Sequence, residues 1–344
     1  MRPTRRGYAV LATVALAFVS ATLFGARGLN AIAGPGVVAL VYAVVQVWRI
    51  EEPTVERSLP RRGEQGSTVP VELQLDADRP YSARLADAVG KGLGASGNER
   101  DVTVGGPPVE YEIGLRRRGD RQLGPATIEA RDVLGLVSRT FEIGARSSIL
   151  VRPPVYPLSG PRADELVWEF GGGDDRQEFD FLRHYQRGDP LRDIHWPSSA
   201  KLPGEGLVVK HFSTDDSTNS IRIAAESEVG HADEMAAAAA SLAVHLLTAG
   251  HRIEFATADT SLDPRGGAEQ RDRVLDALAR TRGGRLHEAD RRGADVVISA
   301  GDDGVTVTVG ETVSPFTDVA GREIAVPARD PDGSGLMDRL GGLA

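Results

Sequence analysis

Two long apolar runs open the chain. Residues 8–26 contain no charged side chain, and residues 29–48 contain none either. Each run is about 20 residues long, the length that a helix needs to cross ~30 Å of hydrocarbon at about 1.5 Å per residue. Between them, Arg27 and Gly28 leave room only for a tight turn. The pattern predicts an N-terminal transmembrane helical hairpin, a two-helix membrane anchor over residues 1–48.

The same opening segment also fits a cleaved signal peptide. Residues 1–6 form a basic start, and an apolar run follows them directly. A signal peptide does not account for the second apolar run, so the sequence favours the hairpin.

Arginines near the ends of the two runs predict the orientation of the hairpin. Only Arg27 lies between the runs, whereas the outer ends carry Arg2, Arg5, Arg6, Arg49, Arg57, Arg61 and Arg62. Because Lys and Arg concentrate in cytoplasmic loops, we expect both termini and the soluble domains to be cytoplasmic. The expected location is the cell membrane, with two spans.

Residues 51–154 alternate between apolar and polar positions. The clearest stretches are residues 69–75 and 109–115, and shorter ones occur at 102–104, 126–130, 141–143 and 149–151. Alternation over short runs is typical of half-buried antiparallel strands. The region is therefore predicted to be an all-β, sandwich-like domain that serves as a spacer. Residues 81–97 look Gly-rich and loop-like.

Residues 217–330 change to strands that alternate with helices. Strands are predicted at 221–225, 253–257, 296–299, 305–309 and 324–326. A helix over 231–248 would present Met235, Ala239, Leu242 and Leu246 on one face. A second helix over 268–282 would use Val274, Leu275 and Leu278. This order favours an α/β domain with a doubly wound parallel sheet, followed by a tail at 331–344.

Composition narrows the possible functions. The 344 residues carry a formal net charge of -9, and 26% of them are charged. An acidic chain lacks the basic face that nucleic-acid binding needs, and the absence of Cys rules out disulfides, thiolate metal sites and Cys nucleophiles. No Walker loop, dinucleotide fingerprint or Gly-x-Ser-x-Gly motif occurs. We therefore expect no cofactor, no nucleic acid and no small-molecule substrate.

A dense charged motif lies between the two predicted soluble domains. Residues 178–201 read EFDFLRHYQRGDPLRDIHWPSSAK and combine both charge signs with aromatic side chains. In one interpretation the charges pair with each other and brace a loop around a buried Trp196. In the other, Arg183, Arg187 and Arg192 form an anion or partner site. A third, weaker possibility is a hydrolase that uses the Asp/His/Arg groups at 180–196.

This motif resembles that of the family called domain of unknown function 58. The matching positions are Arg183, Tyr185, Gly188, Asp189, Arg192, Ile194, Trp196 and Ala200, whereas His195 and Lys201 replace the family's usual Asp and Arg. Residues 117–119, 123–125 and 132–136 resemble further family stretches, as does the hairpin. The resemblance implies a membrane-anchored prokaryotic protein, often encoded beside a MoxR-type AAA+ ATPase. By this resemblance, residues 155–216 form the segment that contains the family's motif.

The resemblance also implies a von Willebrand factor A-like C-terminal domain over 217–330. Such domains often hold a divalent metal through Asp-x-Ser-x-Ser after the first strand. The corresponding stretch is Ala225-Glu226-Ser227-Glu228-Val229, in which Ala225 and Val229 cannot ligate through their side chains. The metal site is therefore expected to be degenerate near Glu226 and Ser227, with no metal bound.

These observations predict a protein-interaction module rather than an enzyme. The hairpin would fix it to the membrane, and the α/β domain, braced by the charged motif, would present a binding surface. The resemblance suggests a MoxR-type AAA+ ATPase as partner, in the assembly or maturation of other proteins. Arg183, Tyr185, Gly188, Asp189, Arg192, His195 and Trp196 are the structural or partner-binding candidates.

Overall fold

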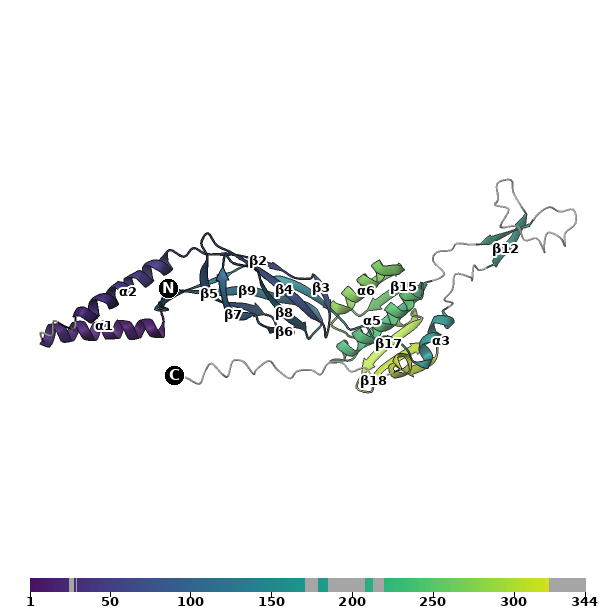
Figure 1. Cartoon of the computed structure of the whole chain (residues 1–344). Helices are drawn as coiled ribbons and strands as arrows, with labels where there is room; N and C mark the ends of the chain where they lie inside the picture. Colours follow the sequence, from purple (N-terminus) through teal and green to yellow (C-terminus); the bar gives the residue numbers. More distant parts are fainter. Residues whose placement is uncertain (25–27, 29, 171–178, 185–207, 213–219, 322–344) are drawn as a thin grey trace. The chain divides into compact units, whose positions relative to one another are not determined.

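The computed structural model describes residues 1–24, 28, 30–170, 179–184, 208–212 and 220–321. Within these residues the chain divides into two compact units, between Arg152 and Pro153. The first unit contains two apolar helices and most of the β-structure, and the second contains an α/β sheet (Figure 1).

The first unit begins with two helices that pack against each other, α1 (Arg5–Phe24) and α2 (Asn30–Trp48). The stretch Arg5–Leu23 is long and apolar enough to cross a membrane, whereas the apolar stretch Ala33–Trp48 of α2 is shorter. The helices approach closely at Gly36, where an added Cβ would collide with the side chain of Val14. Small residues at such contacts are common between membrane helices.

The helices are fixed to the β-structure by the residues at their outer ends. Before α1, the short strand β1 (Arg2–Pro3) pairs antiparallel with β10 (Val137–Ile143). The hydroxyl of Thr4 donates a hydrogen bond of 2.5 Å to the carbonyl oxygen of Gly135. One turn later, a Cβ at Gly7 would collide with the carbonyl oxygen of Leu136, so only glycine fits.

The last turns of α2 reach the same place. Ala43 and Val47 are fully buried there against Leu136 and Val137. The outer ends of both helices therefore contact one turn of the β-structure, residues 132–136 between β9 and β10. The sequence did not predict this contact.

Two sheets pack around a common core in the first unit. The larger sheet runs β1-β10-β9-β11-β3, with β5 paired to β9 and β7 paired to β5, and the smaller runs β2-β4-β8-β6. The strands not yet bounded are β2 (Thr54–Ser58), β3 (Arg62–Glu64), β4 (Thr68–Asp76), β5 (Tyr81–Val89), β6 (Leu93–Ser96), β7 (Glu99–Val104), β8 (Val109–Leu115), β9 (Gly119–Arg131) and β11 (Ser147–Arg152).

The alternating pattern located the core strands correctly. Along β4 the residues Val71, Leu73 and Leu75 are buried, and along β8 the buried ones include Ile113 and Leu115. They join residues of the larger sheet, such as Leu85, Ile128 and Ile149, in one hydrophobic cluster. Two sheets that bury alternate residues against each other form a sandwich.

The expectation of a loop over residues 81–97 was wrong. This stretch forms β5 and β6. The alternation is present in β5, but Ala83 and Asp87 occupy two of the three buried positions with Leu85. Ala and Asp are depleted in strands, and the hydrogen bonds of β5 to β7 and β9 override that weak preference.

The second unit is built on a sheet with the order β16-β15-β14-β17-β18-β19. Its strands are β14 (Ser220–Ser227), β15 (Arg252–Thr257), β16 (Ser261–Arg265), β17 (Val296–Gly301), β18 (Gly304–Val309) and β19 (Thr312–Pro315). Its helices are α3 (Pro161–Glu169), α5 (Ala232–Thr248), α6 (Gly267–Arg280), α7 (Glu288–Arg292) and α8 (Phe316–Ala320). The four predicted strands that fall within the described residues are present.

The predicted helix faces are confirmed. Met235, Ala239, Leu242 and Leu246 of α5 are all fully buried, and so are most of the alanines between them. α5 contacts β14, β15, β17 and α6, which explains why an Ala-rich helix is buried around so much of its surface. Val274, Leu275 and Leu278 of α6 are buried as expected.

The sheet is mixed rather than wholly parallel. Only the central strands β15, β14 and β17 run parallel, whereas β16, β18 and β19 pair antiparallel with their neighbours. The connections explain the difference, because the links to the antiparallel strands are hairpin turns and a parallel connection needs a dozen or more residues. The helix α3 was not predicted, and its Ala163 and Leu166 are buried in the core of this unit.

The remaining β-structure is a two-stranded pair, β12 (Phe179–His184) and β13 (Val208–Phe212), which are antiparallel. The strand predicted at 324–326 and the tail at 331–344 lie outside the described residues.

We predict that the second unit loses stability in mild acid through His251. Burial lowers the pKa of His251, and a hydrogen bond with the backbone of Val167 offsets only part of this effect. Below pH ~6.5, the usual value for imidazole, the unfolded chain therefore binds more protons than the folded one, and stability falls as the pH falls. His251→Asn should make the melting temperature less dependent on pH between 7.5 and 5.5.

The matched control is His287→Asn, because His287 is exposed. That variant should keep the pH dependence of the wild type in thermal unfolding of the full chain in detergent. An unchanged pH slope in His251→Asn would show that another group is responsible.

Candidate functional site

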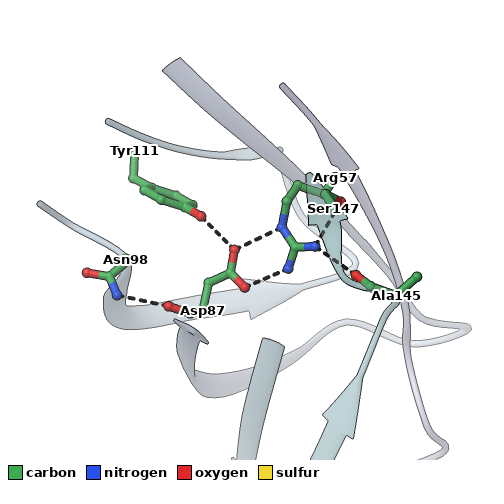
Figure 2. Close-up of polar contacts among 6 residues, drawn as sticks. All are labelled: Arg57, Asp87, Asn98, Tyr111, Ala145 and Ser147. Carbon is green, nitrogen blue, oxygen red and sulfur yellow. Dashed lines mark hydrogen bonds and ion pairs between the residues drawn. The ribbon is translucent and has the colours of Figure 1, made fainter. Parts of the chain in front are cut away.

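Two buried polar clusters stand out among the described residues, one in each unit. The first lies between the two sheets of the sandwich and centres on Arg57 of β2 and Asp87 of β5 (Figure 2). The guanidinium donates to both carboxylate oxygens, at 3.0 and 2.6 Å. Its third nitrogen donates to the carbonyl oxygen of Ala145 at 2.9 Å and the hydroxyl of Ser147 at 3.1 Å. Tyr111 donates to Asp87 at 2.6 Å.

This first cluster is closed to solvent and saturated. The side chains of Arg57 and Asp87 are 2% and 0% exposed. Burial, and then the hydrogen bond with Asp87, raise the pKa of Tyr111, so the phenol remains a donor. Arg57 and Tyr111 come from the smaller sheet and Asp87 from the larger one, so the cluster joins the sheets. Removing one partner of such a pair typically costs about 3–5 kcal/mol, which marks it as structural.

The second cluster lies at the carboxyl edge of the parallel strands in the α/β unit. The ends of β14, β15 and β17 meet there, since Glu226 pairs with Ser299 and Ala225 with Thr257 in register. The carboxyl edge is where ligands usually bind in open α/β sheets. Two carboxylates, Glu226 and Asp259, are the main polar groups at this edge.

Glu226 is engaged by three separate donors. Its Oε1 accepts a hydrogen bond from Ser299 at 3.1 Å and an ion pair from Arg291 at 3.1 Å, and its Oε2 accepts from the N–H of Leu286 at 3.2 Å. The Glu226 side chain is 10% exposed, whereas that of Arg291 is 55% exposed. The carboxylate is therefore neutralised from the solvent side by a cation of the chain itself.

Asp259, just after β15, is held in the same way. It accepts hydrogen bonds from the hydroxyls of Thr257 at 2.8 Å and Thr281 at 2.7 Å, and from the N–H of Arg282 at 3.2 Å. Burial by itself would raise the pKa of Asp259, but these hydrogen bonds outweigh it and lower the pKa. Asp259 thus stays ionised and fixes the segment that follows α6.

That segment packs closely over the end of β14. The N–H of Ser227 donates to the carbonyl oxygen of Gly284 at 3.0 Å. A Cβ at Gly283 would collide with the hydroxyl of Ser227, and the φ of 77° at Gly283 also favours glycine. The hydroxyl of Ser227 is buried without a hydrogen-bond partner in the described part of the chain.

This geometry bears on the metal site considered from the sequence. A cation at Glu226 would have to displace the guanidinium of Arg291, and Val229 projects fully into solvent. Within the described ranges, no three His, Asp or Glu side chains come together as a metal site would require. The residues present at this edge do not fit a Mg²⁺ ion, which prefers near-octahedral oxygen ligands.

The charged motif predicted from the sequence is mostly outside the described residues. Arg183 lies on β12, whereas Tyr185, Gly188, Asp189, Arg192, His195 and Trp196 fall in the undescribed range 185–207. The brace, the anion site and the hydrolase therefore all remain predictions.

Sequence reasoning found Glu226 and Ser227 but missed their partners. Arg291 and Ser299 lie more than 60 residues later, and Asp259 is one of many surface-type acids in the sequence. One signal was available: the strand pattern places residues that end parallel strands at a common edge, which would have brought Glu226 and Ser299 together.

Comparisons with known proteins add no family. No family model matches the chain, and no curated protein matches it. Among solved structures, a PKD domain of an M14-like peptidase from a Thermoplasmatales archaeon is 13% identical over 30% of this chain and 97% of that domain, with a TM-score of 0.20. A fragment of Escherichia coli alpha-2-macroglobulin is 20% identical over 34% of this chain and 21% of that one, with a TM-score of 0.25. The CARDB domain of a Pyrococcus furiosus protein is 12% identical over 30% and 94%, with a TM-score of 0.22.

We predict that Arg291 stabilises the carboxyl edge. Arg291→Ala leaves the buried carboxylate of Glu226 without its cation and should lower the free energy of unfolding by roughly 1 kcal/mol, a value reduced by the exposure of Arg291. The neighbouring Arg292 is the matched control, because its pair with Glu288 is about three-quarters exposed on both sides. Arg292→Ala should change stability by less than about 0.5 kcal/mol. Equal effects in denaturant unfolding would contradict the assignment.

Proposed function

We propose that this chain is a membrane-anchored, cytoplasm-facing protein-interaction module that acts with an AAA+ ATPase of the MoxR type. The main observation in support of a membrane anchor is that the outer ends of two apolar helices contact the same turn of the β-sandwich, residues 132–136. The hairpin thus projects from one end of the sandwich and leaves its apolar sides uncovered.

The exposed surface of the helices supports a lipid environment. Leu16 and Leu23 of α1 are 69% and 71% exposed, and Val38 of α2 is 68% exposed. Most of the large apolar side chains that are exposed in the described residues lie on these two helices. Apolar surface of this extent is costly in water, so we infer that lipid covers it.

The connections favour two spans over one. α1 and α2 pack along each other, and β1 before α1 and β2 after α2 are both part of the sandwich sheets. A single span would place these two strands on opposite sides of the membrane. We infer that α2 also crosses, and the arginines at the outer helix ends favour the cytoplasm as the side of the sandwich.

Binding rather than catalysis suits the α/β unit. The carboxylates at its strand edge are engaged by Arg291 and by hydroxyl and N–H donors, so neither is poised as a general base or a metal ligand. The resemblance to domain of unknown function 58 supports a von Willebrand factor A-like domain, and the second unit is an α/β domain with a partly parallel sheet. The ATPase as partner rests on that resemblance alone.

We predict that the C-terminus is cytoplasmic. A reporter enzyme that is active only outside the cytoplasm, fused after Ala344 of the full chain, should stay inactive. The same reporter fused within the short segment between α1 and α2 should be active and serves as the positive control. Strong activity of the C-terminal fusion would contradict the proposed orientation.

We predict that the full chain, solubilised in detergent, captures an AAA+ ATPase and that Arg192 contributes to this contact. Arg192→Ala should change folding stability by less than about 0.5 kcal/mol and yet weaken capture, because a guanidinium can grip a partner carboxylate with two hydrogen bonds. In the braced interpretation of the motif Trp196 is the buried anchor, so Trp196→Ala should instead destabilise the fold by about 3–5 kcal/mol.

The control is Arg285→Ala, because Arg285 is 83% exposed in the second unit and outside the motif. Its capture should equal that of the wild type, with mass spectrometry identifying the captured protein. Capture of no AAA+ ATPase by the wild type would overturn the partner. Normal capture by Arg192→Ala would overturn only the role of the arginine.

A further inference from the structure

The turn at residues 132–136 contacts the outer ends of both helices. It also carries two apolar side chains that are exposed. Val133 is 80% exposed and Leu134 49% exposed. These two residues lie beside the end of α2, since the N–H of Val133 is hydrogen-bonded to the side chain of Gln46 at 3.4 Å.

The turn is rigid, so the exposure is built in. The carboxylate of Asp132, a residue only 4% exposed, accepts hydrogen bonds from the N–H groups of Leu134 at 2.9 Å, Leu136 at 2.7 Å and Val137 at 2.7 Å. Gly135 adopts a φ of 68°, which closes the turn. These hydrogen bonds hold the backbone of the turn in the conformation that exposes Val133 and Leu134.

The level of the turn along α2 places it at the end of the apolar span. Gln46 is two residues before Trp48, the last residue of α2, which is 70% exposed. Trp is enriched at the boundary between lipid and water. The apolar surface of Val133 and Leu134 therefore continues that of the helices at the depth of this boundary.

The surrounding charge suits an anionic membrane surface. Arg2, Arg5, Arg6 and Arg49 are exposed around the outer helix ends, and a membrane with anionic lipids attracts such basic groups. The combination of apolar tips and a basic rim is the pattern of segments that sit in the interface.

We propose that the 132–136 turn is a second membrane-contact element: Val133 and Leu134 insert into the interfacial layer of an anionic bilayer and set the sandwich directly on its surface. The inference rests on the proposed membrane anchor and adds that the sandwich is seated on the lipid rather than held away from it. Lipid is the occupant, because the exposed apolar surface is continuous with that of the helices.

The absence of native cysteines allows a direct test. Single-cysteine variants Val133→Cys and Leu134→Cys of the full chain are labelled with an environment-sensitive fluorophore and reconstituted in vesicles of phosphatidylcholine and phosphatidylglycerol. Nitroxide groups on the lipids then quench the fluorescence of labels that lie in the bilayer, and iodide quenches that of labels that lie in water. Both labels should be quenched severalfold more by the lipid nitroxide, and less by iodide, than a label at Thr68→Cys.

Thr68 is the matched control because it is exposed at the far end of β4, whose nine residues span ~30 Å. Its label should respond to iodide. Val41→Cys, on the exposed side of α2, reports on the anchor itself and should respond to the lipid nitroxide.

The outcomes separate the two proposals. If the label at 41 responds to lipid while those at 133 and 134 behave like that at 68, the seating of the sandwich is wrong and the anchor stands. If the labels at 133 and 134 are shielded from both quenchers, protein covers the turn and the inference is overturned. If the label at 41 is quenched by iodide and not by the lipid nitroxide, α2 does not lie in the membrane. Both the proposed anchor and this inference are then wrong.

Discussion

The carboxylate of Asp132 fixes the contact on which the N-terminal half of the molecule depends. By accepting hydrogen bonds from the N–H groups of Leu134, Leu136 and Val137, it shapes the turn that places Leu136 against the two helix ends. Thr4 and Gly7 then meet the carbonyl groups of this turn from α1, and Val47 meets its side chains from α2. The helices are therefore joined to the sandwich by packed contacts at both outer ends, and not merely by the peptide chain.

Buried acids elsewhere in the molecule follow the same rule. The carboxylate of Asp87 is matched by a guanidinium and a phenol, and that of Glu226 by a guanidinium, a hydroxyl and a backbone N–H. A buried charge left without partners costs several kcal/mol, so each acid is stable only because the fold supplies its donors.

The sequence predicted what depends on periodicity and missed what depends on distant partners. Alternation located β4 and β8, and the helical period located the buried faces of α5 and α6. The strand β5 escaped because its buried positions include Ala83 and Asp87, and Asp87 is tolerated there only through Arg57, 30 residues away. The strand β1 is only two residues long, too short for a hydrophobic pattern. It forms because its backbone pairs with the edge of β10.

Glycine positions indicate how closely the two N-terminal helices are packed. Gly36 lets α2 approach Val14 of α1, and Gly7 lets the start of α1 approach the backbone of Leu136. At either position a larger side chain would push apart elements that are each held by further contacts. Both helices and the turn thus contact one another at several points around Leu136.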